Sequence, residues 1–201
     1  MSIHPPPMPT PRQIRHRIRA LRRGLSQAEQ RRHARALARN LERTPAYRRA
    51  RRIAFYLAAD GEIDPRLALE RALRAGKRCY LPVLAKRRRR SLWFVAYHRR
   101  TRLQRNRFGI PEPSLRHRER VAPMGLHIIV MPLVAFDAAG HRLGMGGGFY
   151  DRTLSYLRRR RHWKAPKLIG AAHELQRIEQ IAPETWDIPL DLVVTEAGAY
   201  G

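Results

Sequence analysis

A glycine-rich stretch between an apolar run and an expected helix constrains this chain more than any other feature. Residues 131–152 contain five glycines together with Asp137, Arg142 and Asp151. Glycines lack Cβ, so their backbone N–H groups can converge on an anion, and the start of a following helix adds partial positive charge. Arg142 supplies a planar donor fork that is always protonated, and Asp151 could hold a magnesium ion beside phosphate groups. The stretch is therefore predicted to bind phosphate.

The two common nucleotide-binding loops do not fit this stretch. A dinucleotide G-x-G-x-x-G that starts at Gly144 would need glycine where Phe149 stands. The Gly-Lys-Ser/Thr that ends a P-loop is absent. The phosphate site must therefore belong to a more particular kind of protein.

Short apolar runs alternate with amphipathic segments along the chain. Between residues 12 and 41 apolar side chains recur at close to a 3.6-residue period, and Ser26 and Glu29 have capping-box spacing, which predicts two helices or one helix broken near Gly24. Further helices are expected at residues 64–75 and 149–161. Strands are expected at residues 53–58, 78–84, 91–97, 126–131, 168–172 and 192–195. This alternation predicts an α/β fold with a mostly parallel sheet and helices on both faces.

The length and the connections bound the domain organisation. A chain of 201 residues holds one substantial core, and no repeat or linker divides it, so a single domain over residues 12–201 is expected after a proline-rich, disordered tail at 1–11. The connection 99–125 has little periodicity, and loops of that length are usually functional or disordered. The glycine-rich stretch follows the expected strand 126–131. Its ligand should therefore lie outside the carboxyl end of that strand.

The net charge of +26, from 42 Lys and Arg against 16 Asp and Glu, would attract polyanions. The arginine runs at 87–90 and 158–161 could neutralise nucleic-acid phosphates. The arginines are, however, spread over every expected element without a nucleic-acid motif, which favours a basic surface with at most non-specific polyanion binding. No apolar run approaches the roughly 20 residues that cross a bilayer. Cys79 is the sole cysteine, which fits a reducing cytoplasm.

Several motifs occur in a definite order along the chain. The central one is Arg142-Leu143-Gly144-x-Gly146-x-Gly148-x-Tyr150-Asp151, preceded by Pro132 and Ala135-Phe136-Asp137. The others are Gln13-Ile14-Arg15, Arg22-Arg23-x-Leu25-Ser26, Gly61-Glu62-Ile63-Asp64, Gly109-Ile110-Pro111-Glu112-Pro113, Gln176, Trp186-Asp187 and Asp191-Leu192-Val193-Val194-Thr195-Glu196. In this order, over roughly residues 12 to 196, they resemble the 5-formyltetrahydrofolate cyclo-ligase family, also called methenyltetrahydrofolate synthetases.

The resemblance implies a three-layer α/β/α domain and a ring closure that depends on ATP and Mg²⁺. In that reaction 5-formyltetrahydrofolate becomes 5,10-methenyltetrahydrofolate, with release of ADP and phosphate. The γ-phosphoryl group is transferred to the formyl oxygen, N10 of the folate attacks the activated carbon, and phosphate departs. The nucleophiles belong to the substrate, which agrees with the absence of G-x-S-x-G and H-E-x-x-H motifs.

The resemblance also assigns ATP-binding residues in two segments. They are Arg12, Gln13, Ile14, Arg15, Arg142, Leu143, Gly144, Met145, Gly146, Gly147, Gly148, Phe149 and Tyr150. Arg142 is expected to be catalytic by binding the charge that develops on the transferred group. Pro11 stands where the family often has a lysine, and Arg12 could supply the missing charge.

The folate-binding residues implied by the resemblance are Leu57, Glu62, Met145, Gly146, Gly147, Gly148 and Phe149. The Glu62 carboxylate could accept hydrogen bonds from the amino and ring N–H groups of the pterin. Asp151 and Asp187 match the magnesium positions, although Asp187 taken alone would more often be a turn residue. A positive surface would also attract ATP and folates that carry glutamate tails.

Two other functions stay open at this point. A different ATP- or phosphosugar-handling enzyme with a similar loop would bind magnesium and nucleotide without folate turnover. A basic nucleic-acid-binding protein would bind polyanions with a steep dependence on salt.

Overall fold

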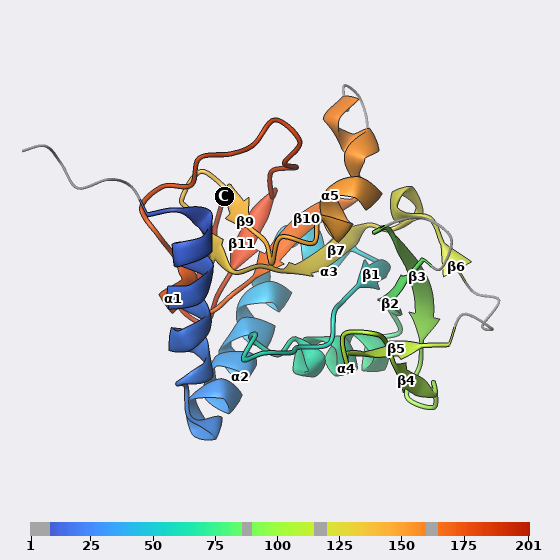
Figure 1. Ribbon diagram of the computed structural model, residues 1–201. Helices are drawn as coiled ribbons and strands as arrows, with labels where there is room; N and C mark the ends of the chain where they lie inside the picture. Colours follow the sequence, from blue (N-terminus) through green and yellow to red (C-terminus); the bar gives the residue numbers. More distant parts are fainter. Residues whose placement is uncertain (1–8, 86–89, 115–119, 160–164) are drawn as a thin grey trace, which may run out of the picture.

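The computed structural model describes residues 9–85, 90–114, 120–159 and 165–201 (Figure 1). The chain begins with α1 (Pro11–Arg23) and α2 (Gln27–Arg43), separated at Gly24 as predicted. Thr10 and Ser26 cap these helices with their side chains, each in a capping box. The predicted tail 1–11 is wrong at its end, because Thr10 and Pro11 form the start of α1; residues 1–8 lie outside the described residues.

The centre of the domain is an eight-stranded sheet with the order β12-β11-β10-β7-β1-β2-β3-β6. Its strands are β1 (Arg52–Ala54), β2 (Arg78–Leu84), β3 (Leu92–Tyr97), β6 (Arg120–Val121), β7 (Ile128–Pro132), β10 (Lys167–Ala171), β11 (Leu192–Val194) and β12 (Ala199–Tyr200). The run from β11 through β10, β7 and β1 to β2 is parallel, whereas β12, β3 and β6 pair antiparallel. The prediction of a mostly parallel sheet is confirmed.

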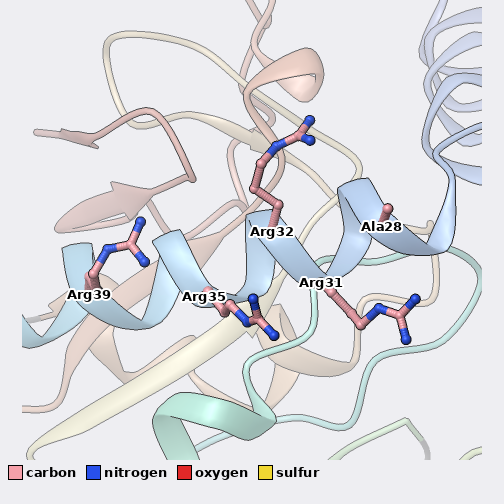
Figure 2. Close-up of a pocket in the computed structure, with 5 residues that line it drawn as sticks. All are labelled: Ala28, Arg31, Arg32, Arg35 and Arg39. Carbon is pink, nitrogen blue, oxygen red and sulfur yellow. The ribbon is translucent and has the colours of Figure 1, made fainter.

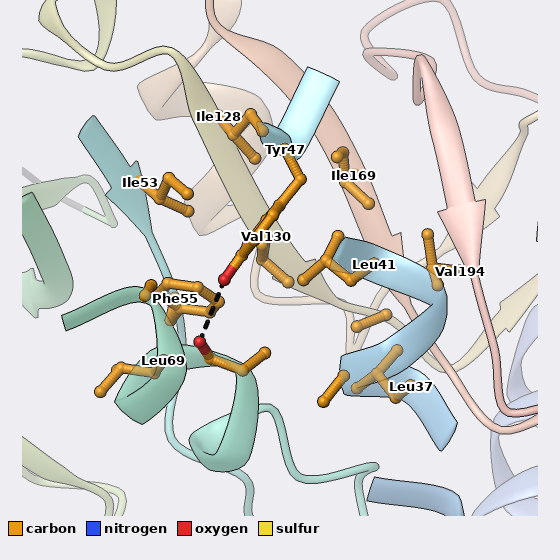
Figure 3. Close-up of a cluster of buried hydrophobic side chains, with 14 of the residues drawn as sticks. Leu37, Leu41, Tyr47, Ile53, Phe55, Leu69, Ile128, Val130, Ile169 and Val194 are labelled. Carbon is orange, nitrogen blue, oxygen red and sulfur yellow. Dashed lines mark hydrogen bonds between the residues drawn. The ribbon is translucent and has the colours of Figure 1, made fainter. Parts of the chain in front are cut away.

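Helices cover one face of the sheet more thickly than the other. On one face α2, α3 (Pro45–Arg49) and α4 (Arg66–Arg74) pack against the strands. Figure 3 shows this cluster, in which the buried Tyr47 hydroxyl donates to the Ala68 carbonyl oxygen over 3.2 Å. On the opposite side lie α5 (Phe149–Thr153) and η2 (Ser155–Arg159), which bury Leu154 and Leu157 (Figure 1). The sheet thus lies between two layers of one domain, as predicted.

Two expected elements differ from the structure. The continuous helix predicted at 149–161 is wrong, because the α-helix stops at Thr153 and a 3₁₀ segment follows; residues 160–164 lie outside the described residues. The connection 99–125, expected to be irregular, forms the hairpin β4 (Leu103–Arg105) to β5 (Pro111–Pro113), followed by β6 and η1 (Pro123–Gly125). The Asn106 side chain closes the hairpin turn by accepting from the N–H groups of Phe108 and Ile110.

A second hairpin, β8 (Ala135–Phe136) to β9 (Arg142–Leu143), connects β7 to the glycines at 144–148. The buried Asp137 carboxylate orders its turn by accepting from the N–H groups of Ala139 and His141. Elsewhere, η3 (Glu174–Gln176) follows β10. None of the helices within the described ranges has both the length and the apolar character needed to span a bilayer.

Candidate functional site

A cavity of about 1110 Å³ opens at the carboxyl ends of β1, β2 and β7. Leu57 after β1, Leu84 at the end of β2 and Leu133 after β7 belong to its wall. Ligands of open α/β sheets bind outside the carboxyl ends of the strands. The cavity also exceeds the usual range of roughly 300–1,000 Å³ for small-molecule sites. It therefore has room for more than one ligand, at the edge of the sheet where the glycine-rich stretch was expected.

Most of the predicted site residues line this cavity. They are Arg15, Leu57, Glu62, Arg142, Leu143, Gly144, Met145, Gly146, Gly147, Gly148, Phe149, Tyr150, Asp151 and Asp187. In the described part of the chain, Arg12, Gln13 and Ile14 are not in its wall. The Gln13 side chain accepts from the Thr10 N–H in the capping box, and Ile14 is buried beside Val134. An ATP-binding role for these three residues stays a prediction.

The glycine-rich loop, residues 144–148, is held against α1. The Arg15 Nε donates to the Gly144 carbonyl oxygen over 2.8 Å. Gly146 has φ +89°, in the region that favours glycine, and a Cβ there would lie 3.8 Å from the Arg15 guanidinium carbon. The Arg152 Nη2 donates to the Gly147 carbonyl oxygen at the other end of the loop. Two motifs far apart in sequence are thus joined at one wall of the cavity.

Arg142 and Asp151 form an ion pair in this wall. The Arg142 side chain is only 6% exposed, and its Nη1 donates to the Ile188 carbonyl oxygen while its Nη2 donates to Asp151 Oδ1. Strand β9 positions the arginine, and the first turn of α5 positions the aspartate. The predicted catalytic residue and one predicted magnesium ligand are therefore partners in this structure.

Asp187 lies in the segment between η3 and β11, not at the end of a strand. Its Oδ2 accepts from the Glu184 N–H over 3.0 Å, and its own N–H donates to the Glu184 carbonyl oxygen, so that it closes a local turn. Asp187 and Asp151 nevertheless line the same cavity, and Asp151 is 24% exposed. Mg²⁺ is usually bound by one or two carboxylates together with substrate oxygens. The two carboxylates that line the cavity are therefore suitable ligands for the predicted Mg²⁺ ion.

The turn that precedes Glu62 is anchored by α1. Asp60 has φ 53° and accepts ion pairs from Arg19, Arg22 and Arg23. Burial would raise the pKa of Asp60, but the hydrogen bonds from these three arginines outweigh it and lower the pKa to about 2. A Cβ on Gly61 would lie 3.0 Å from the Arg22 carbonyl oxygen, so the close approach of the turn to α1 requires glycine.

This anchor predicts a loss of stability at low pH. The pKa of Asp60 falls from 3.8 to about 2 on folding, so its contribution is present above pH 3.8 and is lost as the pH falls toward 2. Because Asp60 is 21% exposed, we expect a contribution of about 1–2 kcal/mol. Urea unfolding at pH 5 and pH 2.5 checks this: the free energy of unfolding should drop less in Asp60→Asn than in the wild type. An equal drop in both proteins would contradict the expectation.

Glu62 lines the cavity together with Leu57 and Tyr56. Burial raises the pKa of its carboxyl, and the hydrogen bond that Oε2 accepts from the Ala59 N–H, over 3.0 Å, partly offsets that effect. A half-buried carboxylate with one oxygen engaged by the backbone has acceptor capacity left for a ligand. The site therefore offers a place for N–H donors of a polar ring system.

Aromatic side chains from three segments form the outer wall. Phe108 and Phe149 meet edge to face with ring centroids 5.8 Å apart, and Phe108 is 56% exposed. Trp186, next to Asp187, also lines the cavity and is 56% exposed. Sequence reasoning missed Trp186 as a wall residue, along with Arg19 and Arg152. The Trp186-Asp187 motif was a signal in the sequence that could have identified Trp186. No pattern distinguished Arg19 and Arg152 from the other arginines of the chain.

A separate depression of about 440 Å³ lies over α2. It is lined by Ala28, Arg31, Arg32, Arg35 and Arg39. Figure 2 shows that the four guanidinium groups fan out from the helix in different directions instead of converging on one point. This surface is strongly basic, but it lacks the convergent donors of a built anion site.

Comparison with known proteins gives one family. The model of the 5-formyltetrahydrofolate cyclo-ligase family matches residues 7–196. The chain is 44% identical over 151 residues to the 5-formyltetrahydrofolate cyclo-ligase of Escherichia coli K12, which covers 75% of this chain and 81% of that protein. It is 38% identical over 186 residues to the enzyme of the same name from Haemophilus influenzae, covering 90% and 96%.

Solved structures agree with these relatives. The NMR structure of Aquifex aeolicus 5,10-methenyltetrahydrofolate synthetase superposes with a TM-score of 0.80 at 30% identity, covering 94% of this chain and 91% of that one. The Mycoplasma pneumoniae 5,10-methenyltetrahydrofolate synthetase has the same fold, with a TM-score of 0.71 at 20% identity. The chain belongs to the 5-formyltetrahydrofolate cyclo-ligase family.

Proposed function

We propose that this protein converts 5-formyltetrahydrofolate to 5,10-methenyltetrahydrofolate with ATP and Mg²⁺, releasing ADP and phosphate. The observation that carries the proposal is a single cavity of about 1110 Å³ that has a carboxylate, Glu62, and the glycine-rich loop with Arg142 in the same wall. The names of the relatives support the folate conversion. The family resemblance supports the dependence on ATP and Mg²⁺. The glycine-rich loop and Arg142 in the cavity wall suit phosphate, and Asp151 and Asp187 suit Mg²⁺.

The folate would lie between Glu62, Leu57 and the aromatic wall. Glu62 accepts hydrogen bonds from the pterin, as its remaining acceptor capacity allows. The apolar and aromatic side chains of Leu57, Phe108 and Phe149 cover the ring faces.

The triphosphate would lie against the glycine-rich loop. Backbone N–H groups of residues 144–148 and the guanidinium groups of Arg15 and Arg142 are the donors available for its oxygens. Asp151 and Asp187 would hold Mg²⁺, which supplies neutralisation of phosphate charge when bound. The Arg142–Asp151 ion pair suits this arrangement, because an anion can be received by one partner and a cation by the other.

The chemistry needs positioning and charge neutralisation more than a protein nucleophile. The formyl oxygen attacks the γ-phosphorus and ADP leaves. N10 then attacks the formyl carbon and gives up its proton to the phosphate group, the C–O bond breaks, and inorganic phosphate leaves with the oxygen. Arg142 binds the charge that spreads over the transferred group. Filling of the cavity by both substrates would keep water from competing with N10. We further propose a cytoplasmic location, where the lone, buried thiol of Cys79 stays reduced.

One assay tests this proposal. Purified protein is incubated with 5-formyltetrahydrofolate, ATP and Mg²⁺, and the absorbance of the methenyl product is followed together with the release of phosphate. One phosphate per methenyl product is expected, with no product when either ATP or Mg²⁺ is left out. Nucleotide and magnesium binding without folate turnover would favour the phosphosugar alternative. Binding of nucleic acid with a steep salt dependence and no turnover would favour the polyanion alternative.

Glu62→Gln should weaken folate use more than ATP use. The amide keeps the shape and the Ala59 hydrogen bond but replaces one acceptor by a donor that faces the pterin. A lost hydrogen bond to a charged group is worth about 1.5–3 kcal/mol, so we expect the KM for folate to rise about 10- to 100-fold. Steady-state kinetics with each substrate varied in turn measure this. Glu70→Gln, on the exposed face of α4, is the control, and equal losses for both substrates would exclude a folate-specific role.

Asp151→Asn and Asp187→Asn should each raise the Mg²⁺ concentration needed for half-maximal activity. If both carboxylates bind one ion, the fold-loss of activity in the double variant should be far smaller than the product of the fold-losses in the two single variants. Asp64→Asn, an acid of the α4 start outside the cavity wall, controls for the change of charge. Multiplicative losses would show that the two aspartates act independently. Asp151→Asn also removes the ion pair with Arg142. Its turnover at saturating Mg²⁺ is therefore compared with that of the wild type, which separates this effect from weaker Mg²⁺ binding.

A further inference from the structure

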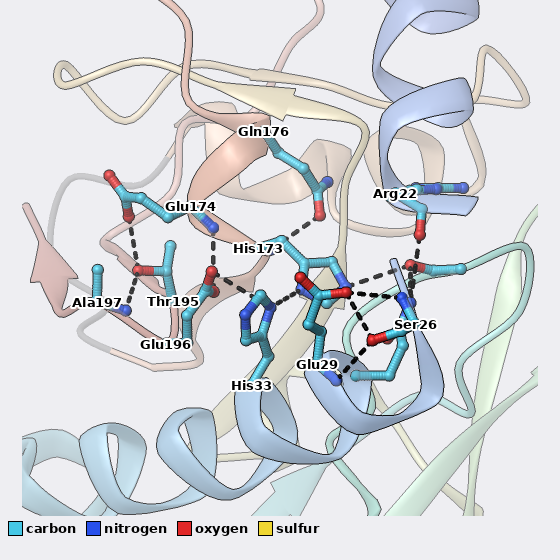
Figure 4. Close-up of polar contacts among 12 residues, drawn as sticks. Arg22, Ser26, Glu29, His33, His173, Glu174, Gln176, Thr195, Glu196 and Ala197 are labelled. Carbon is cyan, nitrogen blue, oxygen red and sulfur yellow. Dashed lines mark hydrogen bonds and ion pairs between the residues drawn. The ribbon is translucent and has the colours of Figure 1, made fainter. Parts of the chain in front are cut away.

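A cluster of two histidines and a glutamate lies away from the proposed catalytic residues. His33 comes from α2, His173 follows β10, and Glu196 follows β11 (Figure 4). His33 Nδ1 lies 2.9 Å from His173 Nδ1 and 3.3 Å from Glu196 Oε1. Three elements that are distant in sequence thus bring three potential metal ligands to one point.

The hydrogen bonds around the cluster fix where its lone pairs point. His173 Nε2 lies 3.2 Å from the Gly61 carbonyl oxygen, which can only accept, so Nε2 carries the proton and Nδ1 of His173 is a lone pair directed at His33. Glu196 is held from its far side, because its Oε2 accepts from the Glu174 N–H over 3.0 Å. The remaining oxygen of Glu196 is directed at His33. A proton on His33 Nδ1 therefore faces both of these acceptors.

We propose that His33, His173 and Glu196 bind a divalent transition-metal ion of the zinc type, which replaces this proton. Tetrahedral zinc with ligand distances of about 2.0–2.1 Å requires ligand atoms roughly 3.3 Å apart. The observed separations of 2.9 and 3.3 Å are close to that spacing, and all three ligand atoms lie within 4.8 Å of one another. Two histidines and one carboxylate are a known zinc ligand set, with water as the fourth ligand.

The surroundings suit metal binding in two further ways. The Gly61 carbonyl oxygen and the Glu174 N–H orient His173 and Glu196, as outer hydrogen-bond partners do in metal sites. The His33 and Glu196 side chains are 13% and 17% exposed, which gives the ion and its water an entry path.

The ligand set also separates this ion from the magnesium of the proposed reaction. Imidazole nitrogen suits zinc, cobalt, nickel and copper, whereas Mg²⁺ prefers carboxylate, carbonyl and water oxygens. A bound ion would cross-link α2 to the ends of β10 and β11 beside Gly61, which precedes Glu62. The expected effect is on stability first, because ions that bind only the folded state raise the free energy of unfolding.

The test uses the full chain freed of metal with a chelator that is then removed. Co²⁺ is titrated to follow the visible absorption of tetrahedral cobalt, and Zn²⁺ is titrated by calorimetry and by the rise of the melting temperature. We expect one Zn²⁺ per chain, displacement of Co²⁺ by Zn²⁺, and no competition by millimolar Mg²⁺. His33→Gln and Glu196→Gln, which change half-buried side chains, should each weaken Zn²⁺ binding at least 10- to 100-fold.

His98→Gln is the matched control, because His98 is exposed and lies outside the cluster. It should leave the affinity for Zn²⁺ and the cobalt spectrum unchanged. The proposal is overturned if the wild type binds no stoichiometric Zn²⁺, if His33→Gln binds as tightly as the wild type, or if His98→Gln loses as much affinity as His33→Gln. Since none of these measurements uses turnover, the outcome is independent of the proposed folate reaction.

Discussion

Arg142→Ala is expected to lower turnover by about 10²- to 10³-fold, the usual cost of removing a donor from developing charge. Arg142 is the most buried cation in the proposed phosphate wall and pairs with Asp151, so no neighbouring guanidinium can take its place without rearrangement. The fold should also lose about 1–3 kcal/mol, because the Ile188 carbonyl oxygen would be left without its donor. The effect on kcat should exceed the effect on stability.

Single-turnover kinetics and urea unfolding separate these two effects. Arg142→Lys keeps the charge but not the fork that contacts Ile188 and Asp151 together, so its turnover should fall between the wild type and the alanine variant. Arg152→Ala removes an exposed arginine from the same wall and should cost much less. Near-normal turnover of a folded Arg142→Ala protein would exclude a catalytic role for this residue.

Arg22→Met is expected to lower the free energy of unfolding by about 1–3 kcal/mol, because buried acceptors lose their donor. The Arg22 side chain is fully buried and donates to the Asp60 backbone oxygen and carboxylate, both over 2.8 Å. Its Nη1 also lies 3.5 Å from the Leu133 carbonyl oxygen, beside the cavity. Methionine fills a similar volume but donates nothing, so these acceptors would be left without a buried donor.

The partners of the same carboxylate provide matched controls. Arg19 and Arg23 also pair with Asp60, but they are 36% and 55% exposed, so Arg19→Met and Arg23→Met should each cost only about 0–1 kcal/mol. Urea unfolding of the three variants gives the comparison. Equal losses would show that burial of Arg22 does not set its contribution. Because Arg22 also positions the turn that precedes Glu62, the KM for folate should rise in Arg22→Met but not in Arg23→Met, since Arg23 lies outside the cavity wall.

Local patterns in the sequence predicted the elements whose boundaries depend on neighbouring residues. The break at Gly24 follows from the capping box of Ser26 and Glu29, which forms within one turn of helix. The strand at 78–84 is found with those bounds because its apolar run is continuous. The glycine-rich loop was also recognisable, because closely spaced glycines are a local signal of unusual backbone.

Elements whose form depends on distant partners were not predictable in the same way. The expected strand 53–58 ends at Ala54, where its neighbours in the sheet stop pairing with it. The expected helix 149–161 changes at Leu154, whose side chain is fully buried against the sheet. The connection 99–125 pairs with itself and supplies Phe108 to the cavity, although no periodicity indicated a hairpin.

The sequence by itself determined the fold class, the family and the segments that carry the site, because these depend on apolar periodicity and on motifs read along the chain. The motifs already singled out Arg142, but only the tertiary structure showed which arginines are buried and which partners they have. Arg22 became a buried anchor and Arg142 a partner of Asp151, whereas the arginines of α2 stayed on the surface. The structure alone also brought His33, His173 and Glu196 together. The role of a charged side chain or of a metal ligand depends on its burial and on the partners that the fold brings to it. Burial and partners distant in sequence are not encoded by the spacing of residues along the chain.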